Sequence, residues 1–302
     1  MVIDRLIEEI GRKKNPCIVG IDPEWIKIPD CYKTDGVWKA ESILQWAIDI
    51  IDAVADIVPA VKPQMAFFEV FGADGIRVHQ KIVEYAHSKG LTVVDDSKRN
   101  DIGNTARAYA YAHLAKEGPI NADFLTVSPF LGTDSIQPFI DIAVHDGKGL
   151  FVLVKTSNPS SVELSEAVNI HGEKICDWLA GYVNVMGKCC VGEYGYSDIG
   201  AVVGATFPED AQQLRKLMPN NFFLVPGFGV QGGGAADVMP CFNEDGFGAL
   251  VSSSRGILYK YLDIAEYDNT RTLYQEIVRK QAQTMQKAVY SELKKTYINM
   301  KY

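Results

Sequence analysis

The chain contains eight short runs of apolar residues, each ending in a polar or glycine/proline cluster and followed by a longer stretch with helical spacing. The runs are rich in Val, Ile, Leu and Phe and are apolar almost throughout, rather than at alternate positions. Such continuous apolarity predicts parallel strands that are covered on both faces, as in α/β proteins. The predicted strands are Cys17–Asp22, Ile57–Lys62, Leu91–Asp96, Asp123–Ser128, Leu150–Lys155, Ala201–Ala205, Phe222–Pro226 and Phe247–Ser252.

Segments in which apolar residues recur at helical spacing lie between the predicted strands and at both ends of the chain. Between strands it predicts helices that include Trp38–Asp56, Gly75–Lys89, Thr105–Lys116, Thr133–Asp146 and Pro208–Met218. Eight strand–helix units at this spacing are typical of a (β/α)8 barrel. We therefore predict an α/β fold in which residues 1–302 form a single barrel domain. Extra helices, in Met1–Asn15 and in Glu266–Met300, are expected to pack outside the barrel.

The composition is that of an ordinary globular protein. Of 302 residues, 47% are hydrophobic and 23% charged, which excludes disorder, collagen and coiled coil as descriptions of the whole chain. The net charge of −8 opposes non-specific binding to nucleic acid. Six cysteines form no C-x-x-C pair, which favours free thiols in a reducing compartment. No run resembles a signal peptide or a membrane span, so we expect a cytoplasmic protein with no membrane partner.

Charged and polar residues gather where the predicted strands end. In a barrel of this kind the carboxyl ends of the strands form the active face, so these residues are candidates for chemistry. The candidates are Asp22, Lys62, Asp96, Lys98, Ser128, Lys155 to Asn158, Gln231 and Arg255.

The segment Val93–Thr105, V-V-D-D-S-K-R-N-D-I-G-N-T, carries alternating charges directly after a strand. Asp96 and Lys98 are two residues apart in extended chain and therefore face the same side. Asp101 lies where a helix should begin, near its positive end, and Lys62 comes from the neighbouring strand. Such an array keeps two ammonium groups charged in a partly dry pocket, because each carboxylate offsets the desolvation that lowers the pKa of a buried lysine. It can hold a proton donor beside a forming carbanion and a carboxylate against a departing anion.

The run D-S-K-R-N-D-I-G-N-T resembles the D-x-K-x-x-D signature of the orotidine 5′-monophosphate decarboxylase family, and its D-x-K-R-x-D-I-G form is similar to one bacterial branch of it. Other segments resemble that family in the same order along the chain: V-K-P-Q-M-A-F-F-E at Val61–Glu69, K-T-S-N-P at Lys155–Pro159, V-G-A-T-F-P-E at Val203–Glu209, V-P-G-F-G-V-Q-G-G at Val225–Gly233 and S-S-S-R-G at Ser252–Gly256. The resemblance implies a carboxy-lyase that converts orotidine 5′-monophosphate to uridine 5′-monophosphate, the last step of de novo UMP biosynthesis, without metal or organic cofactor. Lys155 lies in one of these motifs without an assigned role.

The resemblance also implies a role for each residue of the array. Lys98 would stabilise and protonate the carbanion at C6 of the pyrimidine. Asp96 would press on the leaving carboxylate, and Lys62 would order the array near the ribose. Asp101, with Thr105, would reach into the active site of a second subunit, which implies a homodimer with shared sites.

The remaining substrate contacts are implied by the resemblance and, for the phosphate, by the barrel itself. Asp22 resembles a residue that contacts the ribose hydroxyls, Ser157 one that reads the pyrimidine amide, and Gln231 one that bridges phosphate and base. Barrels of this kind hold phosphate in the loops after the seventh and eighth strands. Glycine there lets backbone N–H groups approach the phosphate oxygens, and arginine can donate two parallel hydrogen bonds to them. The residues expected there are Pro226, Gln231, Gly232 and Arg255. Candidate lids are Pro159–His171 and Val230–Ala236.

Three other functions fit part of this pattern. Gly227, Gly229 and Gly232 spell G-x-G-x-x-G, so an NADP-dependent reductase is possible, although the motif follows the seventh strand instead of opening a βαβ unit. Magnesium-dependent sugar-phosphate decarboxylases and synthases share the D-x-K-x-x-D motif. They resemble one another in carrying a glutamate on the second strand that helps to bind the metal, whereas this chain has Lys62 at that position. A non-enzymatic nucleotide sensor would need Arg255 but not a costly buried lysine–carboxylate array.

The five histidines fall mostly in helical patterns, where packing or surface roles are the usual explanation.

Overall fold

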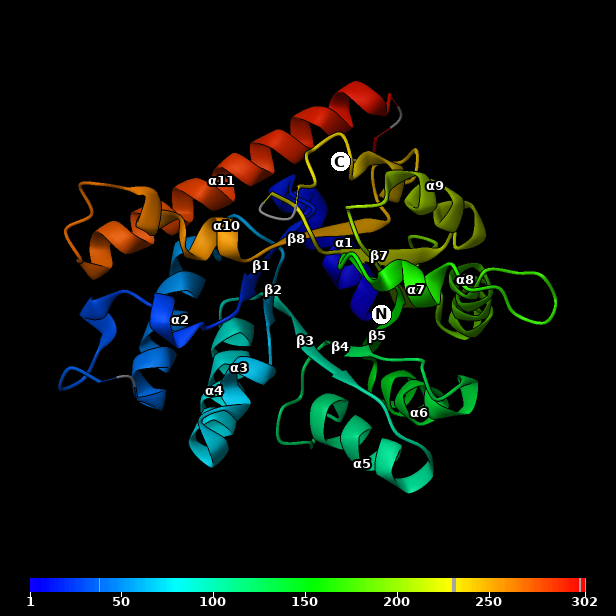
Figure 1. Cartoon of the computed structure of the whole chain (residues 1–302), viewed down its shortest axis with the longest axis horizontal. Coiled ribbons are helices and arrows are strands. Elements are labelled where there is room, and N and C mark those ends of the chain that lie inside the picture. The colour runs from blue at the N-terminus through cyan, green and yellow to red at the C-terminus, as the bar shows by residue number, and fades with distance from the viewer. Residues whose placement is uncertain (38, 230–231, 299, 302) are drawn as a thin grey trace.

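Eight parallel strands close into one barrel, which confirms the predicted fold (Figure 1). The computed structural model of the chain describes residues 1–37, 39–229, 232–298 and 300–301. The strands pair in sequence order, and pairing of the first with the last closes the ring. Their bounds are β1 Cys17–Ile21, β2 Ala60–Pro63, β3 Thr92–Arg99, β4 Phe124–Val127, β5 Gly149–Lys155, β6 Ser197–Val203, β7 Asn221–Val225 and β8 Ala249–Ser253.

Helices surround the barrel and bury one face each against it (Figure 1). The longer ones between strands are α2 Ala40–Val54, α4 Gly72–Ser88, α5 Gly103–Leu114, α6 Gln137–Asp146, α8 Ile175–Gly187 and α9 Pro208–Leu217. Short helices follow β2, β5 and β8: α3 Ala66–Glu69, α7 Ser161–Ser165 and α10 Arg255–Leu258. Five of the longer helices match the stretches named from the sequence within a few residues, whereas α8 is not among those stretches.

The first helix, α1 Val2–Lys13, closes the end of the barrel where the strands begin. Its apolar residues, which include Ile3, Leu6 and Ile10, form one buried cluster with side chains from inside the barrel. Those interior side chains are Ile18, Ala60, Val94, Phe124, Phe151, Val202, Phe222, Leu224 and Leu250. Asp198, near the start of β6, accepts a hydrogen bond from the Ile3 backbone N–H at 2.9 Å. With this end sealed, the carboxyl ends of the strands form the open mouth.

The last helix, α11 Arg271–Thr296, runs along the outside of the barrel beside α2 and α10 (Figure 1). Tyr274 is fully buried in this contact and accepts a hydrogen bond from the Trp46 indole at 2.7 Å. The prediction of a terminal helix outside the barrel is therefore confirmed. Neither α11 nor any other helix in the described ranges is long and apolar enough to cross a membrane.

Strands β6 and β3 extend furthest beyond their predicted bounds, because they include polar residues, whereas β2 begins at Ala60, later than the predicted Ile57. Strand β6 begins at Ser197, four residues earlier than predicted, because Ser197 and Asp198 are buried and hydrogen-bonded despite their polarity. Strand β3 continues to Arg99, so the charged segment itself is strand, and its pairing with β4 shifts register between Asp95 and Arg99.

Candidate active site

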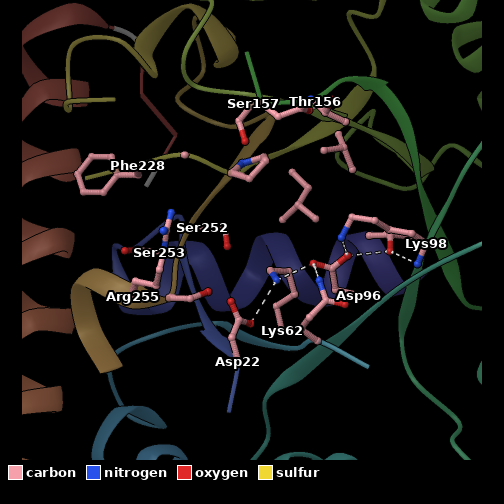
Figure 2. Close-up of a pocket in the computed structure, with 18 of the residues that line it drawn as sticks. Asp22, Lys62, Asp96, Lys98, Thr156, Ser157, Phe228, Ser252, Ser253 and Arg255 are labelled. Atoms are coloured by element: carbon pink, nitrogen blue, oxygen red, sulfur yellow. Dashed lines mark hydrogen bonds and ion pairs between the residues drawn. The ribbon is translucent and has the colours of Figure 1, made fainter. Parts of the chain in front are cut away.

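A cavity of about 450 Å³ lies at the mouth of the barrel, over the carboxyl ends of the strands (Figure 2). It is lined by residues that follow or end most of the eight strands, far apart in the sequence. The predicted site residues that the structure brings together here are Asp22, Lys62, Asp96, Lys98, Ser157, Pro226 and Arg255.

The carboxylate of Asp96 is the centre of the charged array. The Nζ atom of Lys62 lies 2.7 Å from Asp96 Oδ2, and the Nζ atom of Lys98 lies 2.5 Å from Asp96 Oδ1. On the far side of Lys62, Asp22 Oδ1 is 3.9 Å from Nζ. The side chains of Lys62 and Asp96 are almost completely buried, whereas that of Lys98 is 44% exposed. Three of the four residues predicted for the array, Lys62, Asp96 and Lys98, therefore lie together with alternating charge within one chain, and Asp22 extends the array at the Lys62 end. The fourth predicted residue, Asp101, is not part of it within the chain.

Two neutral side chains hold the same carboxylate, and the sequence analysis did not identify either. Gln64 Nε2 donates to Asp96 Oδ2 at 3.1 Å, and Thr126 Oγ1 donates to Asp96 Oδ1 at 3.0 Å. Thr126 is a hydroxyl within the otherwise apolar strand β4, which is the one sequence signal that could have found it. With four donors around it, Asp96 is fixed in orientation as well as in charge.

The pKa shifts of the array follow from burial opposed by charge. Burial alone would raise the pKa of Asp96, but the ammonium groups of Lys62 and Lys98 outweigh it and lower that pKa to about 2. Burial would likewise lower the pKa of Lys62, but Asp96 and Asp22 outweigh it and raise that pKa to about 12. Both groups are therefore ionised across neutral pH.

The backbone of Lys98 adopts an unusual conformation. Its φ is +46°, in the left-handed region that a residue with a Cβ atom enters only at a cost. The register shift between β3 and β4 occurs at this point, and the Lys98 backbone N–H donates to Thr126 Oγ1 at 2.9 Å. Strain at a residue aimed into a cavity is typical of a functional position.

The opposite side of the cavity is formed by the loops after β7 and β8. Gly227 has φ +102°, which favours glycine, and Phe228 beside it lines the cavity with Arg255 (Figure 2). In the described residues the element after this loop is a short 3₁₀ helix, Met239–Cys241, rather than an α-helix. A dinucleotide site needs a helix N-terminus at that place, so the G-x-G-x-x-G interpretation loses its support. Gly232 is exposed and does not line the cavity, and Gln231 lies outside the described residues.

Asp101 and Thr105 lie away from the cavity of their own chain. Asp101 precedes α5, and its carboxylate accepts a hydrogen bond from the Ile102 backbone N–H at 2.8 Å. Thr105 is exposed on the first turn of α5. Neither residue lines the cavity of its own chain.

Two predicted candidates for chemistry at the mouth are corrected by the structure. The Lys155 side chain has no exposed surface and points away from the cavity, and its Nζ lies 2.8 Å from Ser165 Oγ, 2.6 Å from Glu166 Oε1 and 3.0 Å from Asp210 Oδ2. Ser128 lines a separate cavity of about 610 Å³ next to the site. A residue at the end of a strand can face the helices as well as the mouth, and strand position alone does not distinguish the two.

Comparison with known proteins assigns the chain to a family. Residues 15–268 match the model of the orotidine 5′-phosphate decarboxylase / HUMPS family. The chain belongs to this family. An orotidine 5′-phosphate decarboxylase of Clostridium novyi is 39% identical over 292 residues, which cover 97% of this chain and 99% of that protein. The matched region contains all eight strands and every predicted site residue from Asp22 to Arg255.

Solved structures agree with this family assignment. A protein of Streptomyces avermitilis superposes with a TM-score of 0.80 at 33% identity and 95% coverage of both chains. The orotidine monophosphate decarboxylase of Leishmania donovani superposes with a TM-score of 0.70 at 29% identity, covering 94% of this chain and 98% of that one. The family resemblance in the sequence is therefore confirmed, together with the barrel.

Proposed function

We infer that this member of the orotidine 5′-phosphate decarboxylase family removes the carboxylate of orotidine 5′-monophosphate and releases uridine 5′-monophosphate, the last step of UMP biosynthesis. The observation that carries the inference is the carboxylate of Asp96 held between the ammonium groups of Lys62 and Lys98 at one side of a cavity whose other side presents Arg255. This arrangement suits a substrate with a reacting anion at one end and a phosphate at the other.

In this proposal the charged array serves both steps of the reaction, the loss of carbon dioxide and the protonation of C6. The bond between C6 and the carboxylate carbon breaks, carbon dioxide leaves, and the electron pair stays on C6. The ionised Asp96 disfavours the substrate carboxylate next to it, while the Lys98 ammonium stabilises the pair on C6 and then donates a proton to it. Lys98 recovers its proton from water, which reaches its partly exposed side chain before the substrate binds.

Lys62 has two roles in this proposal. Its cation keeps Asp96 ionised despite burial. Its Nζ lies 3.9 Å from Asp22 Oδ1, which supports a second role in ordering the array next to a ribose held by Asp22. Asp22 Oδ1 is buried without a hydrogen-bond partner among the described residues, as expected for an oxygen that a ribose hydroxyl would satisfy. A cation at the position of Lys62 also repels a divalent metal, which supports a reaction without a metal ion.

The phosphate is assigned to Pro226, Gln231, Gly232 and Arg255, and the pyrimidine amide to Ser157. Ser157 lines the cavity, and its backbone carbonyl accepts a hydrogen bond from Thr206 Oγ1 at 3.2 Å. The segments Pro159–His171 and Val230–Ala236 are the proposed lids over the bound nucleotide, and Val230 and Gln231 of the second segment lie outside the described residues. Phosphate contacts far from C6 would then supply the binding energy that positions the ring.

We further propose that the active form is a homodimer in which Asp101 and Thr105 complete the partner's site. The apolar side chains of Ile102, Phe130 and Leu131, from the connections after β3 and β4, are 56%, 72% and 46% exposed, as at a surface that another chain covers. Mixing inactive Lys98→Ala and Asp101→Ala proteins tests this proposal, because a hybrid dimer has one intact site. Recovered activity is expected, and none would contradict shared sites.

The whole chain, residues 1–302, is proposed to work as one catalytic domain in the cytoplasm. The two terminal helices support the domain assignment, since each buries apolar residues against the barrel. All six cysteines are free, and Cys189 is exposed, which suits a reducing compartment.

The experiment that tests the function is the release of carbon dioxide from orotidine 5′-monophosphate by purified protein treated with a chelator. Rapid turnover is expected, and the Lys287→Ala variant, which changes an exposed lysine on α11, should match the wild type. If turnover is absent, or appears only when magnesium is added, the proposal is wrong.

A further inference from the structure

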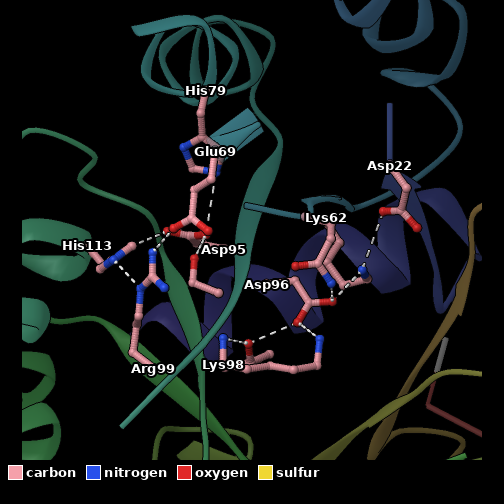
Figure 3. A network of polar contacts seen from close by, with 12 residues as sticks. Asp22, Lys62, Glu69, His79, Asp95, Asp96, Lys98, Arg99 and His113 are labelled. Carbon is pink, nitrogen blue, oxygen red and sulfur yellow. Dashed lines mark hydrogen bonds and ion pairs between the residues drawn. The ribbon is translucent and has the colours of Figure 1, made fainter. Parts of the chain in front are cut away.

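The two neighbouring aspartates of β3 point in opposite directions, and only Asp96 belongs to the array (Figure 3). Asp95 has no exposed surface and faces α4 and α5 on the outer side of the barrel. The proposed reaction makes no use of it. Because a buried carboxylate costs folding free energy unless it is well partnered, its partners indicate what it is there to hold.

Asp95 is the first member of a chain of side-chain contacts that returns to β3. His113 Nδ1, from α5, lies 2.6 Å from Asp95 Oδ2, and His113 Nε2 accepts a hydrogen bond from Arg99 Nε at 3.1 Å. Arg99 also donates through Nη2 to Glu69 Oε1, from α3, at 2.5 Å. Ser97 Oγ donates to Asp95 Oδ1. The chain therefore begins and ends on the strand that carries Lys98, and it is anchored on two helices.

The direction of these hydrogen bonds fixes the state of His113. An arginine N–H can only donate, so His113 Nε2 must be the acceptor and the ring must be neutral. Its single proton is then on Nδ1 and is donated to Asp95. An uncharged His113 with this tautomer joins the carboxylate and the guanidinium without a break in the network.

The residues held by the network are those on either side of the strained lysine. Ser97 precedes Lys98 and is tied to Asp95, while Arg99 follows it and is tied to His113 and Glu69. On the inner side, the Lys98 N–H is held by Thr126. A left-handed backbone persists at a lysine only where its surroundings over-determine it, and here both flanks are fixed.

We propose that Asp95, His113 and Arg99 are positioning residues that clamp the chain on both sides of Lys98 and so aim its ammonium at Asp96 and at the reacting carbon. This inference rests on the proposed role of Lys98 as proton donor. None of the three residues lines the cavity. They act on the reaction only through the backbone of β3.

The test is the split between kcat and KM in the His113→Asn variant. Asparagine can still donate to Asp95 but does not reach Arg99. A small displacement of the proton donor lowers kcat by roughly 10- to 100-fold, whereas KM for orotidine 5′-monophosphate and Kd for uridine 5′-monophosphate should stay near the wild-type values. Arg99→Lys is a second test variant. Because the Arg99 side chain is partly exposed, this substitution should disturb folding less than one at buried His113, and it should lower kcat in the same way.

The matched control is His87→Asn, which breaks another histidine–aspartate pair in the same barrel. His87 Nε2 lies 2.9 Å from Asp123 Oδ2 at the opposite end, where β4 begins. This variant should lose thermal stability but keep its kcat. If His113→Asn and Arg99→Lys keep the wild-type kcat, or if kcat falls in His87→Asn as well, the positioning role is wrong. The absence of turnover in the wild type would instead contradict the proposed function.

Discussion

Two buried lysines, Lys62 near the end of β2 and Lys155 at the end of β5, show that the same side chain can have different roles in one barrel. Lys155 has an acceptor for each of its three N–H groups, within 3.0 Å, from Ser165, Glu166 and Asp210. Within the described residues, Lys62 donates one hydrogen bond, to Asp96, and its Nζ otherwise lies 3.9 Å from Asp22 Oδ1. A buried cation whose donors are all used holds structure together, whereas one with donors to spare can serve a substrate.

The surroundings of Lys155 explain this structural role. Burial alone would lower its pKa, but the hydrogen bonds that its ammonium donates to Glu166 and Asp210 outweigh burial and raise it. Glu166 directly follows α7, and Asp210 lies in the first turn of α9. Lys155 thereby ties both segments to the end of β5, next to the residues that lead to Ser157.

The largest effect is expected at the open array. Lys98→Ala removes the proton donor and the cation nearest the forming carbanion, so kcat should fall by roughly 10³- to 10⁴-fold. Affinity for uridine 5′-monophosphate, measured by calorimetry, should change little, because the product has no charge at C6. Retention of more than a small fraction of the turnover would exclude Lys98 as the donor.

Lys62→Met is expected to have the next largest effect on catalysis. Asp96 and Asp22 would then face each other without the intervening cation, and kcat/KM should fall by roughly 10²- to 10³-fold, as when one preorganised charge is lost from an active site. Steady-state kinetics measures the loss. An active Lys62→Met enzyme would show that the contrast with Lys155 has no functional meaning.

The cation at the phosphate end should affect binding more than chemistry. Arg255→Ala removes charge-assisted hydrogen bonds to the phosphate, which corresponds to a rise in KM of roughly 10- to 100-fold. Kinetics with orotidine 5′-monophosphate measures this rise, and Lys287→Ala again serves as control. An unchanged KM would place the phosphate elsewhere.

Lys155→Met should show the converse behaviour, a loss of stability with little change in kcat. Glu166 and Asp210 are 31% and 25% exposed, so water can solvate them once the lysine is gone. We therefore expect the free energy of unfolding to fall by about 2 kcal/mol, less than the roughly 3–5 kcal/mol lost when a fully buried pair is broken. Urea unfolding measures it. A fall in kcat as large as that of Lys62→Met would make the two lysines equivalent and contradict the comparison.

The smallest effect concerns acid. The folded-state pKa of Asp96 is lowered to about 2, so its contribution to stability is complete above the ordinary value of about 4 and is lost as the pH falls through 2. The difference in unfolding free energy between wild type and Asp96→Asn should thus be constant from about pH 5 to 8 and should shrink below about pH 4. Urea unfolding as a function of pH provides the measurement. A difference that changes near neutral pH would mean that Asp96 is not held ionised by the lysines.

The sequence predicted the parts of the molecule that depend on local pattern and on motif. Continuous apolarity located all eight strands, and the spacing of Asp96 and Lys98 correctly placed both on one face. It did not locate the start of β6, because Asp198 is buried there and accepts a hydrogen bond from the Ile3 backbone N–H of α1, 195 residues away in sequence. The partners of Lys155 were not predicted either, because the sequence pattern does not show which helix ends pack against β5. Thr126 was missed although its hydroxyl stands within an apolar strand. Contacts between distant segments decide whether a polar residue faces the cavity or the helices.

The backbone of Lys98 places folding and function in opposition. Glycine would adopt φ +46° without the strain that any Cβ atom brings, yet glycine carries no amine. Glycine, which suits this backbone conformation best, therefore cannot transfer a proton, and the protein has a lysine there in spite of the backbone strain. In a search for greater thermostability, position 98 is where an inactive but sturdier protein would readily be found.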